Sequence, residues 1–237
     1  FYENRAYGYG GAMTVYDHSD VFGSGDATYT QNSALNTAGA IWVTNSSTVS
    51  WSGETNFSSN TAETSDGGAL FVTGISQVFW SGNTTFANNR AKYLGGAVVL
   101  HESSTAFWKS RTIFTTNTAY AGGALFVQYN ASVAWDGVTY FFNNSADEYG
   151  GAVYCDGSNI SWRTELVFNQ NFAGRYGGAL LVIYGSTLSW SGETRFYDNW
   201  AILYGGALSI SYSNVYFRNN TTFVGNTAIS FGGAVAV

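Results

Sequence analysis

The chain repeats with a period of 27 to 29 residues, and this period constrains its fold more than any other feature. Each repeat carries Phe-x-x-Asn, then Gly-Gly-Ala, then a Trp two positions after an apolar residue. The Gly-Gly-Ala marks end at Ala12, Ala69, Ala97, Ala124, Ala152, Ala179, Ala207 and Ala234, and a variant Ala-Gly-Ala copy ends at Ala40. A short fixed period predicts one supersecondary unit stacked on copies of itself.

Within one repeat, residues predicted to face the core occupy every second position in three short segments. Ser-Gly, Asn-x-Ala and Gly-Gly separate these segments. In residues 48–72 these positions are Val49 and Trp51, Thr55 and Phe57, and Leu70 and Val72. The pattern predicts three strands and three bends per coil, where a coil is one circuit of a repeat. We therefore expect an all-β, right-handed parallel β-helix of about eight coils, each of about 28 residues. Residues 1–237 are expected to form one continuous domain, a slice of a longer repeat array.

One asparagine per coil follows each Phe mark and calls for its own physical reason. Asn tolerates the left-handed backbone of a sharp bend, and its amide can bond to the Asn of the next coil. We expect a structural ladder rather than a ligand site. Its members are Asn4, Asn32, Asn60, Asn89, Asn117, Asn144, Asn171, Asn199 and Asn226.

Composition narrows the function classes. Hydrophobic residues make up 45% of the chain, which is enough for a core, and charged residues only 10%. The net charge is −6 and no basic run occurs, so we expect no nucleic-acid partner. No apolar stretch has the length of a membrane helix.

The paired Gly-Gly-Ala-[Ile/Leu/Val] and Phe-x-x-Asn marks resemble the repeats of the chlamydial polymorphic outer-membrane proteins. The resemblance covers the whole chain. It implies an extracellular β-helical passenger with an adhesive or structural role.

A second set of asparagines lies in Asn-x-Ser/Thr sequons, the acceptor motif for N-glycans. They are Asn45, Asn56, Asn83, Asn130, Asn143, Asn159, Asn219 and Asn220. Every ladder Asn is instead followed by x-Ala and cannot be an acceptor. The pattern predicts a secreted glycoprotein with covalent N-glycans and no other cofactor. Chance sequons in Ser/Thr-rich bends are the alternative.

Catalysis by a β-helix on a polysaccharide needs clustered carboxylates on adjacent coils. The acidic residues here are scattered, and His18 and His101 are isolated, so we expect no catalytic or metal site. Lys109, Asp136 and Arg163 share a column, which predicts a surface ion-pair stack. Cys155 takes an aliphatic position of the core and is expected to be inert.

An apolar stripe is predicted to face outward from the strands after Gly-Gly, because these residues alternate with core positions. It consists of Trp42, Phe71, Val99, Phe126, Tyr154 and Leu181. A second column, Tyr149, Tyr176, Tyr204 and Phe231, precedes Gly-Gly late in the chain. Contiguous exposed aromatic residues mark an interface or a platform for sugars. The alternative is that neighbouring loops cover the stripe.

The leading hypothesis is a non-enzymatic, extracellular structural glycoprotein at the cell surface that assembles into a filament, head-to-tail or laterally. One alternative is an adhesin that binds a glycan or a host surface protein. A second is a polysaccharide lyase or hydrolase.

Overall fold

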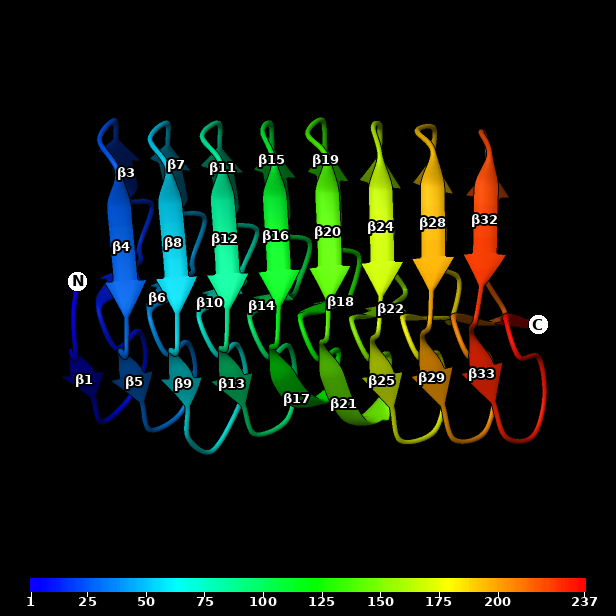
Figure 1. Ribbon diagram of the computed structural model, residues 1–237. Coiled ribbons are helices and arrows are strands. Elements are labelled where there is room, and N and C mark those ends of the chain that lie inside the picture. The colour runs from blue at the N-terminus through cyan, green and yellow to red at the C-terminus, as the bar shows by residue number, and fades with distance from the viewer.

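The computed structural model describes residues 1–237, which form a β-solenoid of about eight coils and no helix. Strands of successive coils lie side by side along the rod, from the N-terminal end at the left of Figure 1 to the C-terminal end at the right. The chain runs down the front sheet and returns behind it while advancing to the right (Figure 1), so the winding is right-handed. All sheet pairings are parallel, and strands of successive coils pair in register. The exception is the pairing of β17 (Thr118–Ala121) with β21 (Ser145–Tyr149), where the register shifts between Ala119 and Ala121.

Two sheets carry the aromatic columns of the core. The Phe sheet consists of β4 (Ala27–Thr30), β8 (Thr55–Ser58), β12 (Thr84–Ala87), β16 (Thr112–Thr115), β20 (Thr139–Phe142), β24 (Leu166–Asn169), β28 (Thr194–Tyr197) and β32 (Thr221–Val224). The Trp sheet consists of β3 (Asp20–Gly23), β7 (Thr48–Trp51), β11 (Gln77–Trp80), β15 (Thr105–Trp108), β19 (Ser132–Trp135), β23 (Asn159–Trp162), β27 (Thr187–Trp190) and β31 (Asn214–Phe217).

The aliphatic sheet follows the Gly-Gly-Ala marks. It consists of β2 (Met13–Val15), β6 (Ile41–Val43), β10 (Leu70–Val72), β14 (Val98–Leu100), β18 (Leu125–Gln128), β22 (Val153–Asp156), β26 (Leu180–Ile183), β30 (Leu208–Ser211) and β34 (Val235–Ala236). The short sheet follows the ladder asparagines. It consists of β1 (Arg5–Ala6), β5 (Ser33–Ala34), β9 (Thr61–Ala62), β13 (Arg90–Ala91), β17 (Thr118–Ala121), β21 (Ser145–Tyr149), β25 (Phe172–Ala173), β29 (Trp200–Ala201) and β33 (Thr227–Ala228).

Four sheets rather than three surround the core, so the prediction of three strands per coil is wrong on this count. The segment taken as a bend contains the short sheet, most of whose strands span two residues. Two residues are too few to show alternation in a sequence. Parallel alignment to the neighbouring coils, as in Thr61 with Arg90, is what makes them strands.

The core consists of columns of like residues stacked along the rod. Rings of the Phe column lie parallel, for example Phe86 on Phe114 at 4.8 Å between centroids. Most of these rings meet a Trp ring edge-on, as Phe86 meets Trp108 at 6.2 Å. Such offset and edge-on contacts are the favoured aromatic geometries. The result is a single buried cluster that includes residues from Val15 to Leu208.

The Gly-Gly pair brings neighbouring coils into close backbone contact. Gly122 has a φ of +62°, in the left-handed region. A Cβ atom at Gly123 would lie 2.1 Å from the carbonyl oxygen of Gly151 in the next coil. The first position therefore favours glycine for its backbone angle, and the second requires glycine for space.

Candidate functional site

The ladder asparagines form one hydrogen-bonded column along the rod. At the centre, Asn117 Nδ2 donates to Asn144 Oδ1 at 3.0 Å and to the carbonyl oxygen of Phe86 at 3.0 Å. The same amide-to-amide bond joins each Asn to the next, from Asn4 to Asn226. Because neighbouring amides satisfy one another along the column, this arrangement fits the structural role predicted for it.

A second buried polar column, of serines, was missed by sequence reasoning. The backbone N–H of Ser47 donates to Ser76 Oγ at 3.2 Å, and that of Ser158 donates to Ser186 Oγ at 3.3 Å. The column lies at the bend between the aliphatic and Trp sheets. Its signal was present in the sequence, because serine recurs there at the repeat period.

The stripe on the outer side of the aliphatic sheet is largely covered. Val99, Phe126 and Leu181 are buried, at 0%, 3% and 5% exposure, so the prediction of an exposed band is wrong for these three. Trp42, Phe71 and Tyr154 are half-buried. The cover comes from the segment just before Gly-Gly, which includes the ends of β17 and β21.

Two contacts illustrate this cover. Leu94, together with Ala121 at the end of β17 and Tyr149 at the end of β21, packs with Val99 and Phe126 in a small apolar cluster. At the N-terminal end, the rings of Tyr9 and Trp42 stack at 4.5 Å.

Toward the C-terminal end the same segment leaves an apolar groove of about 630 Å³. There the outward side chain of the aliphatic sheet becomes smaller from coil to coil, from Tyr154 through Leu181 to Ser209. The smaller side chains leave space above the sheet, which forms the bottom of the groove. One wall is the column of Tyr149, Tyr176, Tyr204 and Phe231. The rings of Tyr176 and Tyr204 lie 5.1 Å apart and are parallel within 2°. Their faces contact each other, so a ligand in the groove meets ring edges and hydroxyl groups rather than ring faces.

The sequon asparagines lie outside the core. Asn45, Asn130, Asn143, Asn159, Asn219 and Asn220 are exposed. Asn56 and Asn83 are half-buried. Asn56 lies within β8, in the Phe sheet, and its Oδ1 has no hydrogen-bond partner. Glycan attachment at these positions stays a prediction.

The carboxylates are distributed along the surface and several pair with arginine. Asp136 and Arg163 form an ion pair at 2.9 Å, which is two of the three members of the predicted charge stack. Glu148 pairs with Arg175. No group of three or more His, Cys, Asp or Glu residues is arranged to hold a metal ion. The surface offers ion pairs of the kind that contribute little to stability.

Cys155 occupies the aliphatic column of the core, in register with Val127 and Val182. Its side chain is fully buried, and burial raises the pKa of the thiol to about 12. A thiolate is the reactive form of cysteine, so this thiol is poorly suited to nucleophilic chemistry.

Two segments of the chain, residues 54–73 and 138–156, were matched by a family model. Both match the Chlamydia polymorphic membrane protein repeat. Each segment contains one Phe-x-x-Asn mark and one Gly-Gly-Ala mark, so the resemblance read from these motifs is confirmed at two places. No curated protein and no solved structure matched the chain.

The repeat and the solenoid fold together fit a surface-exposed structural or adhesive role. The repeat's name describes its family as membrane proteins. Within the structure, no helix has the length and apolarity needed to cross a bilayer.

Proposed function

We propose that this chain is a non-enzymatic, rigid rod segment of an extracellular surface protein. The observation that carries the proposal is the unbroken core of like-on-like columns, bordered by the asparagine ladder from Asn4 to Asn226. Such a core resists bending at every coil, because each coil contacts both neighbours through packed rings and hydrogen bonds. The paired surface carboxylates and the two repeat matches support the same conclusion.

Electron microscopy tests the rod. Purified chain is expected to appear as straight particles of roughly 40 Å, the length of eight coils at about 4.8 Å each. Bent or globular particles would contradict a rigid segment. Incubation with a panel of polysaccharides tests the absence of catalysis, since any released sugar ends would favour a lyase or hydrolase.

The rod is further proposed to be N-glycosylated at the exposed sequons. Secretion from a eukaryotic host, followed by peptide mapping with and without glycosidase, tests each site. Asn45 and Asn130 are exposed at bends and are expected to carry glycans. Asn56 is the internal control: it is half-buried in β8, so we expect it to stay unmodified. An unmodified chain argues that the sequons arose by chance.

Assembly into a surface filament is the larger-scale part of the proposal. Each coil adds to the previous one by parallel strand pairing in the same four sheets, so further coils can add in the same way. Heterologous addition of identical units gives an open fibre. Electron microscopy of the native source material tests it: uniform fibres support the filament, and discrete short particles contradict it.

The apolar groove favours a second candidate function, an adhesin that binds a host surface protein or a glycan. A double variant, Tyr176→Ser with Tyr204→Ser, removes most of one wall of the groove. Loss of binding to host cells or to a glycan array in this variant would support adhesion at the groove. Tyr16→Ser is the matched control, because Tyr16 is 55% exposed and lies outside the groove.

A further inference from the structure

The outer face of the Phe sheet carries three rows of side chains that run along the rod. The upper row lies just before the strands: Asp26, Glu54, Asn83, Arg111, Val138, Glu165, Glu193 and Asn220. The middle row is Thr28, Asn56, Thr85, Ile113, Tyr140, Val167, Arg195 and Thr222. The lower row is Thr30, Ser58, Ala87, Thr115, Phe142, Asn169, Tyr197 and Val224.

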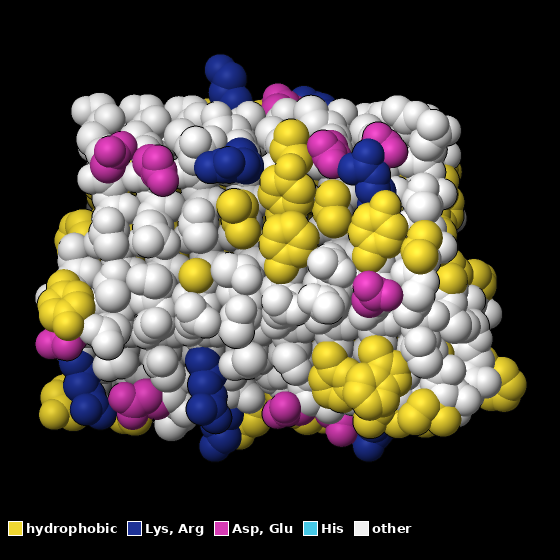
Figure 2. Space-filling model, in the orientation of Figure 1, with side chains coloured by type: hydrophobic (Ala, Val, Ile, Leu, Met, Phe, Trp, Pro, Cys, Tyr) yellow, Lys and Arg dark blue, Asp and Glu magenta, His cyan; other side chains and the backbone are white.

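One coil at the middle of this face is apolar in all three rows. Its residues are Val138, Tyr140 and Phe142, and the last two rings stack at 5.4 Å. Ile113 and Val167 flank Tyr140 in the neighbouring coils. Figure 2 shows hydrophobic side chains gathered at the centre of the face, with white polar surface on the N-terminal side. An apolar centre with a polar surround marks a protein interface.

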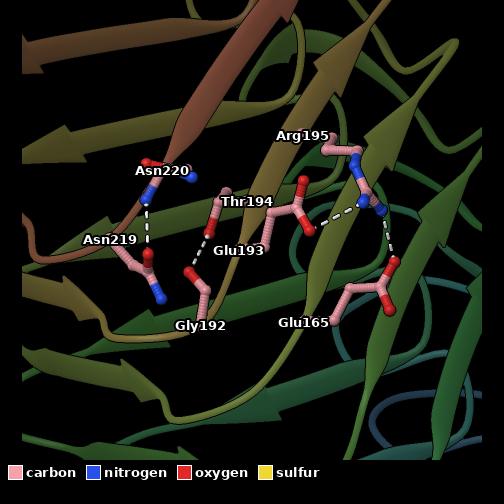
Figure 3. Close-up of polar contacts among 7 residues, drawn as sticks. All are labelled: Glu165, Gly192, Glu193, Thr194, Arg195, Asn219 and Asn220. Atoms are coloured by element: carbon pink, nitrogen blue, oxygen red, sulfur yellow. Dashed lines mark hydrogen bonds and ion pairs between the residues drawn. The ribbon is translucent and has the colours of Figure 1, made fainter.

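Charges of opposite sign lie on the two sides of this apolar centre. Arg111, one coil toward the N-terminus, forms no ion pair within the chain. One coil toward the C-terminus, Glu165 contacts Arg195 at 2.5 Å, and Arg195 also contacts Glu193 at 2.8 Å (Figure 3). Two carboxylates around one guanidinium leave a net charge of −1. A cation without an ion-pair partner therefore lies one coil from Tyr140 on one side, and a net negative cluster begins one coil from it, at Glu165, on the other.

We propose that two copies of this chain associate face to face through the outer face of the Phe sheet, as an antiparallel, two-fold symmetric dimer centred on Tyr140. A two-fold axis parallel to the strands reverses the rod and keeps each row opposite itself. Each coil before the centre then faces the equally distant coil after it in the second copy. A two-fold interface is self-complementary by construction, so each contact occurs twice.

In this arrangement, facing side chains of the two copies complement each other in charge, polarity and size. Arg111 faces Glu165 of the second copy, and the reverse contact repeats it. Ile113 faces Val167, which joins two apolar side chains. Two coils from the centre, the small Ala87 faces the large Tyr197 in the lower row. These pairings follow from the register alone.

The other two-fold arrangement fits less well. An axis along the rod would keep each coil opposite itself and exchange the upper row with the lower row. Arg111 would then face Thr115, and the cluster at Glu165 would face Asn169, so neither charge gains a partner. Charge complementarity therefore selects the antiparallel dimer. The dimer is closed, so it goes beyond the proposed function: it thickens a rod without lengthening it.

Mass measurement by sedimentation equilibrium tests the dimer with charge-reversed variants. The chain is produced without glycans, because three sequon residues belong to the rows of this face: Asn56, Asn83 and Asn220. A glycan on Asn143 would also lie beside Phe142. The unsubstituted chain is expected to reach twice its 25.5 kDa mass as concentration rises. Arg111→Glu and Glu165→Arg each place like charges opposite each other twice, and each should weaken dimerisation at least about tenfold. Arg90→Glu, on the short sheet, is the matched control and should leave it unchanged.

Mixing the two charge-reversed variants is the decisive step. In a mixed dimer the substituted side chain at position 111 faces the substituted one at position 165, and the native pair survives on the other side. The mixture should therefore recover dimer that neither variant forms alone. A mixture that stays monomeric while the unsubstituted chain dimerises overturns the antiparallel geometry, and an unsubstituted chain that stays monomeric overturns the dimer. Circular dichroism of each variant checks that the rod is intact, and electron microscopy of rod length reports separately on the proposed function.

Discussion

Asn117 lies in the middle of the asparagine ladder, and its replacement by alanine probes what the ladder contributes to stability. The substitution removes two hydrogen bonds that the side chain donates, to Asn144 Oδ1 and to the carbonyl oxygen of Phe86. It also removes two that the side chain accepts, from the backbone N–H and the Nδ2 of Asn89. All four are buried, and the backbone N–H of Asn89 is left without this acceptor.

The magnitude follows from this inventory. Each lost bond costs about 1 kcal/mol, and a buried donor without an acceptor adds about 1 to 3 kcal/mol. Partial relaxation and overlap between these costs reduce the sum, so we expect Asn117→Ala to lower the free energy of unfolding by about 4 kcal/mol. For a chain of this size that corresponds to a fall in melting temperature of roughly 10 °C.

Thermal unfolding followed by circular dichroism measures the effect. The matched control is Asn159→Ala, because Asn159 is exposed on β23 and its side chain makes no hydrogen bond within the chain. The control should change the free energy of unfolding by no more than about 0.5 kcal/mol. Equal losses of unfolding free energy in the two variants would refute the view that an asparagine stabilises the rod through its place in the ladder.

Three further predictions address close packing, a buried carboxyl group and the thiol. Gly123→Ala should destabilise the rod by about 4 kcal/mol in chemical denaturation, because its Cβ would meet the Gly151 carbonyl at 2.1 Å. The control is Gly185→Ala, at φ +78° in open space, which should cost about 1 kcal/mol. Similar losses of unfolding free energy in the two variants would contradict the close approach of neighbouring coils at Gly123. Burial raises the pKa of Asp66, so its ionised form destabilises the fold and stability is gained as pH falls through the folded-state pKa. Asp66→Asn should therefore raise the melting temperature at pH 7, and the gain should vanish below about pH 3, where the carboxyl is protonated in both states. A constant gain at every pH would argue against this cause. Cys155 should react with a thiol reagent only upon unfolding, because the native thiol is buried with a pKa of about 12, and rapid labelling of native chain would show that the core is open.

Much of the architecture was predictable because the repeat displays it many times. A single Phe-x-x-Asn could belong to many folds, whereas its recurrence in every coil predicts a stacked column. Cys155 illustrates this: alone it suggests chemistry, but its place between Val127 and Val182 in the period predicts a core position. The columns therefore could be assigned from spacing before any contact was known.

The short sheet was not predictable in the same way. Its strands, such as β9 (Thr61–Ala62), contain too few residues to alternate, and only pairing with neighbouring coils defines them. The exposure of the outward stripe was also not predictable from the sequence. Phe126 points away from the core of its own coil, as the alternation predicts, but Ala121 and Tyr149 pack against it. Sequence patterns report which side of a strand a residue takes, and they carry no information on which segment covers that side.

The sequence by itself determined the period, the identity of the stacked columns and the asparagine ladder, because each is a local pattern repeated at fixed spacing. Only the tertiary structure decided the number of sheets, the cover over the outward stripe and the groove beside Tyr176. It also brought Arg111, Tyr140 and Glu165 onto one face, one coil apart, although more than fifty residues of chain separate Arg111 from Glu165. The physical reason is that these features depend on which groups of different coils and loops lie against one another in space, and spacing along one chain does not specify that.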